Sequence, residues 1–460
     1  MTPKALAFHL AAVLLTISAM AQATDQRPPN VIVIMADDMG YGGLSCFDNH
    51  YFKTPEIDRL AEDGIKLTSF YSNGSLCSPT RAALMTGRYQ QRSGCDEVVN
   101  ADPAEPMHHV GIHDDEWTFP EAMKSAGYST GIIGKWHLGY KDQFNPTLHG
   151  FDEFKGFVSG NIGAHSHRDR MDVEDWWDGT QIKDKPGYHT DLITEESVDF
   201  IERHKDAPFF LYVAHAAPHS PHQARGSAYV RGPLKGQIPT WAPQETYSQT
   251  PGADDWLIKH FLLPLDESVA RIRAKVEELG LAENTIIWFI SDNGGTKGNY
   301  TTSPLTRGGK VDFFEGGIRV PGIVWAPGRT KPGTVSEETI LTFDIMPTSM
   351  ALASANAPAG HTLDGIDVSL ALFENQKLPA TTRFWSMWNG GALREGPWKL
   401  VVQADRKLLF NIVNDPQETT DLANTHPERI GDMYKTYTAM LEETKADSPY
   451  PSLPVRQYYK

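Results

Sequence analysis

The chain has 460 residues, of which 40% are hydrophobic and 22% are charged, so it is long enough to bury a large core. Its 58 acidic and 42 basic residues give a formal net charge of −16 at pH 7. This balance argues against non-specific nucleic-acid binding, although it is compatible with a basic pocket inside an acidic surface.

Residues 1–23 have the layout of a secretory signal. Lys4 precedes an apolar run from Ala5 to Met20, and Ala21-Gln22-Ala23 supplies the small residues of a cleavage site. The apolar run is too short and too weakly apolar for a good membrane span. We therefore expect a mature protein that begins near residue 24, is periplasmic or secreted, and has no membrane contact after cleavage.

Four apolar runs each end in polar residues, and helical patterns separate them. They are Asn30 to Ala36, followed by Asp37 and Asp38; Ser129 to Ile133, followed by Lys135 and His137; Phe209 to Ala214, followed by His215, His219 and His222; and Thr285 to Ile290, followed by Asp292 and Asn293. Continuous apolar runs are typical of strands buried on both faces of a mostly parallel sheet. The predicted fold class is therefore α/β, a mostly parallel sheet flanked by helices. Sites in such sheets lie outside the carboxyl ends of the strands, which places these polar residues on one rim.

The stretch from Ser75 to Gly87 predicts a short helix with Cys77 at its N-terminus. Pro79 suits the first turn, Ser78 or Cys77 can cap it, and Gly87 can close it. Such a helix end stabilises anions and lowers the pKa of a thiol. Arg81, one turn further on, is a cation that can face the same spot. A lone cysteine is also often a buried small hydrophobe, but the rest of the chain favours a functional interpretation.

The chain contains three cysteines, Cys46, Cys77 and Cys95. In an oxidising compartment an odd count leaves one cysteine unpaired or committed to other chemistry. If Cys77 is the committed one, Cys46 and Cys95 could form one bridge.

The pattern changes after about residue 375. Short antiparallel strands are predicted at Phe384 to Trp388, Trp398 to Val402 and Lys407 to Ile412, and an amphipathic helix follows near the C-terminus. We therefore divide the mature chain into a catalytic α/β domain, residues 24–375, and a smaller α+β domain of antiparallel sheet and helix, residues 376–460.

Oxygen donors after two strands favour a hard cation. Asp37, Asp38, Asp292 and Asn293 suit Ca²⁺ or Mg²⁺ better than a thiolate-loving transition metal. Each carboxylate alone would be interpreted as a helix cap or a solvated turn, whereas two pairs after two strands favour a metal site.

Cations and histidines complete the set. Lys135, and Lys310 on a Gly-rich loop, are point charges suited to a tetrahedral oxyanion. His137 and His219 can serve as base and acid, although His215 and His222 compete with His219. The combination indicates metal-assisted hydrolysis of an anionic ester.

These residues resemble the formylglycine-dependent (type I) sulfatases of the alkaline phosphatase superfamily, and the resemblance covers nearly the whole mature chain. It rests on Cys77-Ser78-Pro79-Thr80-Arg81 with Thr86-Gly87, on the run from Gly127 to His137, on Asp37 to Gly42, on Ser291 to Gly294, and on Leu393 to Leu400. Within this family, the sequence most resembles secreted bacterial polysaccharide sulfatases such as carrageenan sulfatases. The resemblance implies an alkaline-phosphatase-like sheet in the larger domain.

The resemblance implies specific roles. A formylglycine-generating maturation enzyme would oxidise Cys77, and the hydrated aldehyde would attack sulfur. Ca²⁺, with Mg²⁺ as the weaker candidate, would be held by Asp37, Asp38, Asp292, Asn293 and an oxygen of modified Cys77. Arg81 and His137 would position the hydrate, Lys135 and Lys310 would bind sulfate, and His219 would protonate the leaving alcohol.

The expected substrate is a sulfated carbohydrate, such as a marine galactan of the carrageenan type. Candidate contacts to the sugar lie in segments where such enzymes vary; they are His165, His167, Arg168, Arg225 and Trp388. Each is otherwise an ordinary surface-loop residue. Three alternatives stay open: a glycosaminoglycan or aryl sulfatase, a phosphomonoesterase or phosphonate hydrolase on the same fold, and a non-catalytic carbohydrate-binding protein with unmodified Cys77.

Overall fold

The computed structural model describes residues 27–47, 53–183, 185–240, 253–450 and 459. The predicted signal, residues 1–23, lies outside this part of the chain. Among the described residues, no helix combines the length and the apolar composition needed to cross a bilayer.

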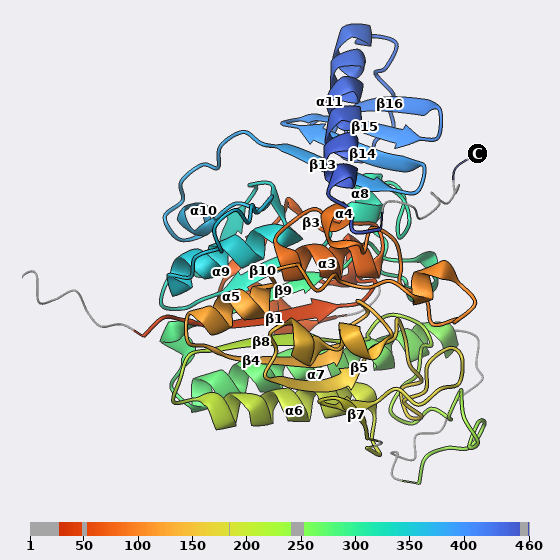
Figure 1. Cartoon of the computed structure of the whole chain (residues 1–460), viewed down its shortest axis with the longest axis vertical. Coiled ribbons are helices and arrows are strands. Elements are labelled where there is room, and N and C mark those ends of the chain that lie inside the picture. Colours follow the sequence, from red (N-terminus) through yellow and green to blue (C-terminus); the bar gives the residue numbers. More distant parts are fainter. Residues whose placement is uncertain (1–26, 48–52, 184, 241–252, 451–458, 460) are drawn as a thin grey trace, which may run out of the picture.

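Ten strands of the described chain form one sheet through the middle of the larger domain (Figure 1). Its centre consists of parallel strands in the order β9, β1, β8, β4, β5. Their bounds are β9 Thr285–Ser291, β1 Asn30–Ala36, β8 Phe209–Ala214, β4 Ser129–Lys135 and β5 Glu153–Phe157. The four apolar runs are therefore adjacent strands, which confirms the predicted α/β fold.

The two edges of the sheet depart from the parallel pattern. Beyond β9, β10 (Gly322–Trp325) runs antiparallel to it, and β2 (Ile65–Leu67) and β11 (Thr334–Ser336) follow. Beyond β5, β6 (Trp177–Asp178) and β7 (Gln181–Ile182) pair antiparallel. A separate parallel pair joins β3 (Phe70–Tyr71) to β12 (Ile340–Leu341).

Helices cover both faces of the central sheet (Figure 1). One face carries α3 (Cys77–Thr86), α5 (Phe119–Ser125) and α9 (Ile345–Ala353), and the other carries α6 (His189–His204) and α7 (Ala253–Glu278). Helix α2 (Pro55–Glu62) packs against α7. Shorter helices are α4 (Gln90–Ser93), α8 (Glu315–Ile318) and α10 (Ser369–Phe373). The predicted capping box of Thr118 and Glu121 begins α5.

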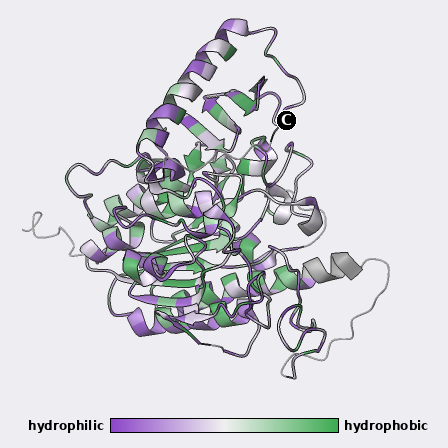
Figure 2. Ribbon diagram, turned by 45° about the vertical axis from the view of Figure 1, so that its right-hand side comes forward, coloured by the Kyte–Doolittle hydropathy of each residue, from purple (hydrophilic) through white to green (hydrophobic). Residues whose placement is uncertain are grey.

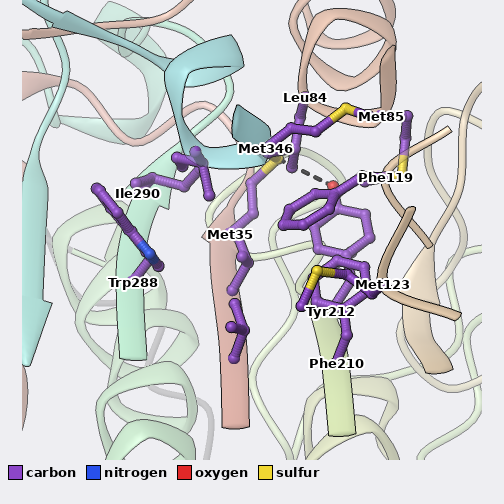
Figure 3. Close-up of a cluster of buried hydrophobic side chains, with 14 of the residues drawn as sticks. Met35, Leu84, Met85, Phe119, Met123, Phe210, Tyr212, Trp288, Ile290 and Met346 are labelled. Atoms are coloured by element: carbon purple, nitrogen blue, oxygen red, sulfur yellow. Dashed lines mark hydrogen bonds between the residues drawn. The ribbon is translucent and has the colours of Figure 1, made fainter. Parts of the chain in front are cut away.

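Both faces of the strands are buried, which explains why their sequences are apolar throughout rather than alternating. Val33 and Met35 of β1 belong to the core on the α3 side, while Ile32 and Ile34 belong to the core on the α7 side. Figure 3 shows the first of these cores, where Met35 and its strand neighbours lie close to side chains of α3, α5 and α9. Each fully buried side chain of this kind stabilises the fold by roughly 1.5–3 kcal/mol.

The C-terminal region is an antiparallel sheet with one long helix against it. The strands are β13 (Thr382–Met387), β14 (Gly390–Glu395), β15 (Trp398–Gln403) and β16 (Arg406–Asn411), and the helix is α11 (Pro427–Ala446). Met433 and Tyr437 are buried, whereas hydrophilic residues are frequent along α11 (Figure 2). The sequence predicted three of these strands and missed β14, because Gly390 and Gly391 lower its apparent strand propensity. The predicted boundary at residue 375 falls between α10 and β13.

The bridge between Cys46 and Cys95, which the sequence left open, is not formed, since both cysteines are free. Cys95 is buried in the core on the α3 side of the sheet, whereas Cys46 packs against the core on the α7 side. The sheet therefore separates the two thiols.

Candidate active site

The polar residues that follow β1, β9 and β4 meet at one rim of the sheet, as predicted. The backbone N–H of Asp38 donates to Asp292 Oδ1 over 3.0 Å, and Asn293 Nδ2 donates to Asp38 Oδ1 over 2.8 Å. Lys135 Nζ lies 2.6 Å from Asp37 Oδ2. All five side chains are buried. Adjacent parallel strands thus bring three carboxylates and an amide together.

Cys77 is the first residue of α3 and points at this carboxylate cluster. Its Sγ donates to Asp37 Oδ1 over 3.4 Å and lies 3.9 Å from Lys310 Nζ. The helix ends as predicted, with Gly87 at a φ of 63°. The predicted cap is wrong, because Leu76 occupies the N-cap position and Ser78 Oγ accepts the N–H of Val99 instead.

The thiol of Cys77 is not activated. Burial raises the pKa of Cys77 above its ordinary value, and the charges of Lys135 and Lys310 only partly oppose this. The expectation that the helix start lowers this pKa is not met, because burial and the carboxylates of Asp37 and Asp292 raise it. A protonated thiol is a poor nucleophile.

Arg81 holds the cluster together. Its Nε and Nη2 donate to Asp292 Oδ2 over 3.0 and 2.7 Å, and its Nη1 donates to the hydroxyl of Tyr212 and to the carbonyl of Lys135. The Nη2 atom lies 3.9 Å from Asp37 Oδ1. The guanidinium is fully buried, so it fixes α3 to the ends of β4 and β9.

Lys310 reaches the cluster from the Gly-rich loop. Its N–H donates to the carbonyl of Gly295 over 2.9 Å, and its Nζ lies 2.7 Å from Asp38 Oδ1. A Cβ on the neighbouring Gly294 would lie 1.9 Å from the carbonyl oxygen of Gly316, so the loop closes only with glycine there. Burial raises the pKa of Asp38, but Lys310 and His219 outweigh it and hold the net pKa well below the usual value.

His137 offers an unused nitrogen. Its Nε2 lies 2.9 Å from the carbonyl oxygen of Val99, and its Nδ1 is buried without a hydrogen-bond partner in the described chain. Burial lowers the pKa of His137 well below its ordinary value, so the ring is neutral. A neutral ring that donates from Nε2 to Val99 leaves Nδ1 as an acceptor.

Of the three competing histidines, His219 is the one at the cluster. Its Nε2 lies 3.7 Å from Asp38 Oδ2, and its Nδ1 lies 2.6 Å from the carbonyl oxygen of Ser220. His215 instead lies 3.0 Å from Ser268 Oγ, and His222 lies 3.2 Å from the carbonyl oxygen of Pro218. Burial lowers the pKa of His219 to about 4.

A cavity of about 270 Å³ opens onto Cys77. It is lined by Leu76, Cys77, Val98, Val99, Asn100, Ala101, His137, Tyr140, Gly160, Asn161, Arg170, His219 and Lys310. None of these described residues carries a carboxylate. Sequence reasoning missed Asn100, Tyr140, Asn161 and Arg170. Tyr140 and Asn161 follow β4 and β5, so the rule that sites lie beyond strand ends would have found these two loops.

The structure does not bring the five candidate sugar contacts to this cavity. His165 and Arg168 line a second cavity of about 310 Å³, where Arg168 Nη2 lies 2.6 Å from Glu174 Oε1. The ring of His167 is buried, with its centroid 4.7 Å from that of Trp176.

The other two candidates, Arg225 and Trp388, are also absent from the described lining of the cavity. Arg225 Nη2 lies 2.6 Å from Asp191 Oδ1 and 2.7 Å from Glu267 Oε2. Trp388 is half-buried and packs against the core of the C-terminal sheet. Local ion pairs and packing thus account for these side chains.

The cluster fits a divalent cation. Asn293 Oδ1 is buried and accepts no hydrogen bond from the described chain, although it lies among carboxylates. One donor atom each of Asp37, Asp38, Cys77 and His219 lies within 4.8 Å of the others. Burial raises the pKa of Asp37 to about 7, against the opposing charge of Lys135. An unpartnered oxygen beside crowded carboxylates is the environment that a hard cation neutralises.

Comparisons with known proteins agree with this geometry. The Sulfatase family profile matches residues 29–355. N-acetylgalactosamine-6-sulfatase of Canis lupus familiaris is 35% identical over 382 residues, which cover 79% of this chain and 69% of that protein. Arylsulfatase A of Bos taurus is 33% identical over 403 residues, which cover 81% of this chain and 73% of that protein.

Among solved structures, the crystal structure of Ps i-CgsB in complex with k-i-k-neocarrahexaose is similar, with a TM-score of 0.79 and 26% identity. The alignment covers 94% of this chain and 95% of that one. The family match, the relatives and the rim of charged residues lead to one conclusion: the chain belongs to the sulfatase family, within the type I sulfatase superfamily, and is a sulfuric ester hydrolase.

Proposed function

We propose that this sulfatase releases inorganic sulfate from a sulfate ester on a carbohydrate, using Cys77 converted to formylglycine and a bound Ca²⁺. One observation carries the proposal. Cys77 lies between the cluster of carboxylates and the cavity that Lys310, His137 and His219 line. A group at this position faces the metal site on one side and the substrate on the other.

The conversion of Cys77 is supported by the sequence around it, and burial disfavours the unmodified thiol as the nucleophile. Burial raises its pKa, so unmodified Cys77 is protonated at neutral pH. Formylglycine, when made by a maturation enzyme, supplies a hydrated aldehyde whose hydroxyl is the nucleophile. The sequence around Cys77 resembles that of sulfatases matured in this way.

The metal would be held by Asp37, Asp38, Asp292 and Asn293, together with an oxygen of modified Cys77. A bound Ca²⁺ would supply positive charge at the oxygens of the sulfate group. Carboxylate and amide oxygens suit Ca²⁺, and Mg²⁺ is the weaker candidate because it demands near-ideal octahedral geometry.

Lys310 and Lys135 supply positive charge to the site from two different positions. Lys310 lines the cavity with Nζ 3.9 Å from Cys77 Sγ, so it is placed to contact a sulfate oxygen. Lys135 is fully buried and lies 2.6 Å from Asp37 Oδ2, without lining the cavity. Its charge therefore acts on the bound sulfate from behind Asp37, in addition to orienting that carboxylate.

The two histidines offer separate places for a proton. His137 Nδ1 is an unused acceptor in the cavity wall, so it can accept the hydrogen bond of the attacking hydroxyl and orient it. His219 donates from Nδ1 to the carbonyl of Ser220, so Nε2 of the neutral ring carries no proton; it would first take up a proton before it could protonate the leaving alcohol.

For the substrate, we propose a sulfated carbohydrate built on galactose or N-acetylgalactosamine, such as a carrageenan-type galactan. The support is the relation to N-acetylgalactosamine-6-sulfatase and to Ps i-CgsB, which was crystallised with k-i-k-neocarrahexaose. We further propose that the chain is exported to the periplasm or secreted, because residues 1–23 have the pattern of a signal. An N-terminus that still carries these residues in protein from its native host would contradict export.

The test of the reaction compares matched aryl sulfate and aryl phosphate esters. Protein made together with a formylglycine-generating enzyme should release sulfate faster than phosphate, measured by ion chromatography. Faster release of phosphate would contradict the proposal and favour a phosphatase. Binding of sulfated sugars without any turnover, by protein whose Cys77 is unmodified in its native host, would favour a carbohydrate-binding protein.

A further inference from the structure

Arg170 differs from the other arginines around the active-site cavity. It lines the same cavity as Cys77 and Lys310, and its side chain is exposed. With the described residues it forms neither an ion pair nor a side-chain hydrogen bond. Arg170 therefore presents an unneutralised charge to whatever enters the cavity.

Two neighbouring arginines, Arg168 and Arg231, have partners within the protein. Arg168 pairs with Glu174 at 2.6 Å. Arg231 donates to Asn161 Oδ1 over 2.6 Å and to the carbonyl of Arg168 over 2.9 Å. These two arginines fix the loops from which Asn161 and Arg170 project.

The acidic residues next to Arg170 are also occupied. Asp169 Oδ1 accepts the N–H groups of Met171 and Val173, each over 2.9 Å. Asp172 Oδ1 accepts the N–H of Gly232 over 2.7 Å. Asp169 thus stabilises the turn, Asp172 joins it to the segment at Gly232, and neither carboxylate forms an ion pair with Arg170.

The charge of the cavity is opposite to that of the protein. The chain carries a formal net charge of −16, yet the cavity lining has two permanent cations, Lys310 and Arg170, and its described residues include no carboxylate. Lys310 is the inner cation, because it lies against Asp38 and close to Cys77. The scissile sulfate ester of the proposed reaction would contact Lys310, and that reaction leaves Arg170 without a role.

We propose that Arg170 binds a second anionic group of the substrate, a sulfate ester or a carboxylate on the same or the adjoining sugar. This inference rests on the proposed function of the Cys77 site. The planar guanidinium matches either anion with two parallel hydrogen bonds, which a lysine cannot reproduce. Arg170 would thus select carbohydrates that carry more than one negative charge.

Binding of defined sugars tests this assignment. The proteins are Cys77→Ala, which prevents turnover, and Cys77→Ala combined with Arg170→Ala or Arg170→Lys. Calorimetry measures Kd for three probes: N-acetylgalactosamine 6-sulfate, with a single anion; a chondroitin 6-sulfate disaccharide, which adds a carboxylate; and a carrageenan tetrasaccharide, which carries sulfates on more than one sugar. The last two probes distinguish the two sources of the second charge.

We expect Arg170→Ala to weaken binding of one or both multiply charged probes by roughly ten- to a hundredfold, the size of a charge-assisted contact. Binding of N-acetylgalactosamine 6-sulfate should change less than about twofold, and Arg170→Lys should restore part of the loss because it keeps the charge. Arg406→Ala is the matched control, since Arg406 is an exposed arginine on β16 outside the cavity lining.

An equal loss for all three probes, no loss for any, or failure of the Cys77→Ala protein to bind multiply charged probes better than the single-anion probe would overturn the role of Arg170. These outcomes are independent of the proposed reaction, which fails instead if the matured wild-type protein releases no sulfate from any sulfate ester.

Discussion

This molecule contains two clusters of buried charged residues, and both combine carboxylates with basic side chains. They differ in whether the buried polar atoms in and beside them have partners. The active-site cluster consists of Asp37, Asp38 and Asp292 with Arg81, Lys135 and Lys310. The second, the junction cluster, consists of Glu315, Glu418 and Lys399, which join the larger domain to the C-terminal sheet. Lys399 Nζ lies 2.7 Å from Glu315 Oε1 and 2.9 Å from Glu418 Oε1, and all three side chains are fully buried.

Every carboxylate of the junction cluster has a partner within the cluster, although Glu418 Oε1 has only the ion pair with Lys399 and no hydrogen bond, whereas residues beside the active-site cluster leave acceptors with neither. Glu315 also accepts the hydroxyl of Tyr71 over 2.7 Å, and its N–H donates to Glu418 Oε2 over 2.6 Å. At the active site, His137 Nδ1 and Asn293 Oδ1 are buried without hydrogen-bond partners in the described chain. Buried charge alone therefore does not identify a site. Here the unpartnered atoms of His137 and Asn293 distinguish the active-site residues from the junction cluster.

The largest effect should follow from Cys77→Ala. We expect kcat to fall by roughly 10⁴-fold or more, because the nucleophile is lost, while Kd for a sulfated sugar stays within a few-fold. Steady-state sulfate release and calorimetry measure the two quantities. Cys95→Ala is the control: it removes a free, buried thiol from the core, so it should lower the melting temperature without lowering kcat. Wild-type kcat in Cys77→Ala would remove Cys77 from the reaction.

Removal of the metal should produce the next largest effect. Dialysis against EGTA should reduce kcat by roughly a hundredfold or more and lower the melting temperature by about a few degrees, because a ligand bound only to the folded state stabilises it. Calcium should restore both, and Asn293→Ala should weaken the restoration. A melting temperature that changes neither on addition of EGTA nor on addition of calcium would contradict the assignment of the cluster as a metal site.

The junction cluster should respond in stability rather than activity. Lys399→Met leaves two buried carboxylates facing each other, so we expect a loss of about 3–5 kcal/mol in the free energy of unfolding. Denaturant unfolding measures this loss, and kcat of the protein that remains folded should equal that of wild type. A selective fall in kcat without loss of stability would show that the two clusters do not differ as described.

The smallest effect concerns pH and Glu418. Burial raises the pKa of Glu418 from 4.5 to about 7, with Lys399 opposing and Glu315 adding to the shift. The stability that this shift contributes is present below about pH 4.5 and is lost as pH rises through about 7. We therefore compare the free energy of unfolding of Glu418→Gln with that of wild type. We expect the difference to shift in favour of Glu418→Gln by about 1–3 kcal/mol as pH rises from 5 to 8. Unfolding curves at both pH values measure the difference, and a constant difference would contradict the raised pKa.

The sequence predicted those parts of the structure that depend on local pattern. The apolar runs, the helix of Cys77 and the polar residues at strand ends are each written in a few consecutive residues, and the sheet brings the last group together. The order of the strands depends on packing across the whole domain. This order decides that Cys46 and Cys95 lie on opposite sides of the sheet.

Local sequence pattern also does not reveal which residues line the cavity. Arg168 and Arg170 are two residues apart and chemically identical, and the sequence favoured Arg168 as a sugar contact. Only the fold shows that Glu174 takes up the charge of Arg168, while Arg170 lines the cavity. The strand β14 was missed because its paired glycines look like a turn, although β13 and β15 hold it on both sides.

The most direct test of the account is the mass of the peptide that contains Cys77, measured beside sulfate release on the same preparations. Conversion to formylglycine removes one sulfur and two hydrogens and adds one oxygen. Preparations made with different amounts of maturation enzyme should show kcat in proportion to the converted fraction. Equal kcat at every converted fraction, or full activity with unmodified Cys77, would contradict the account.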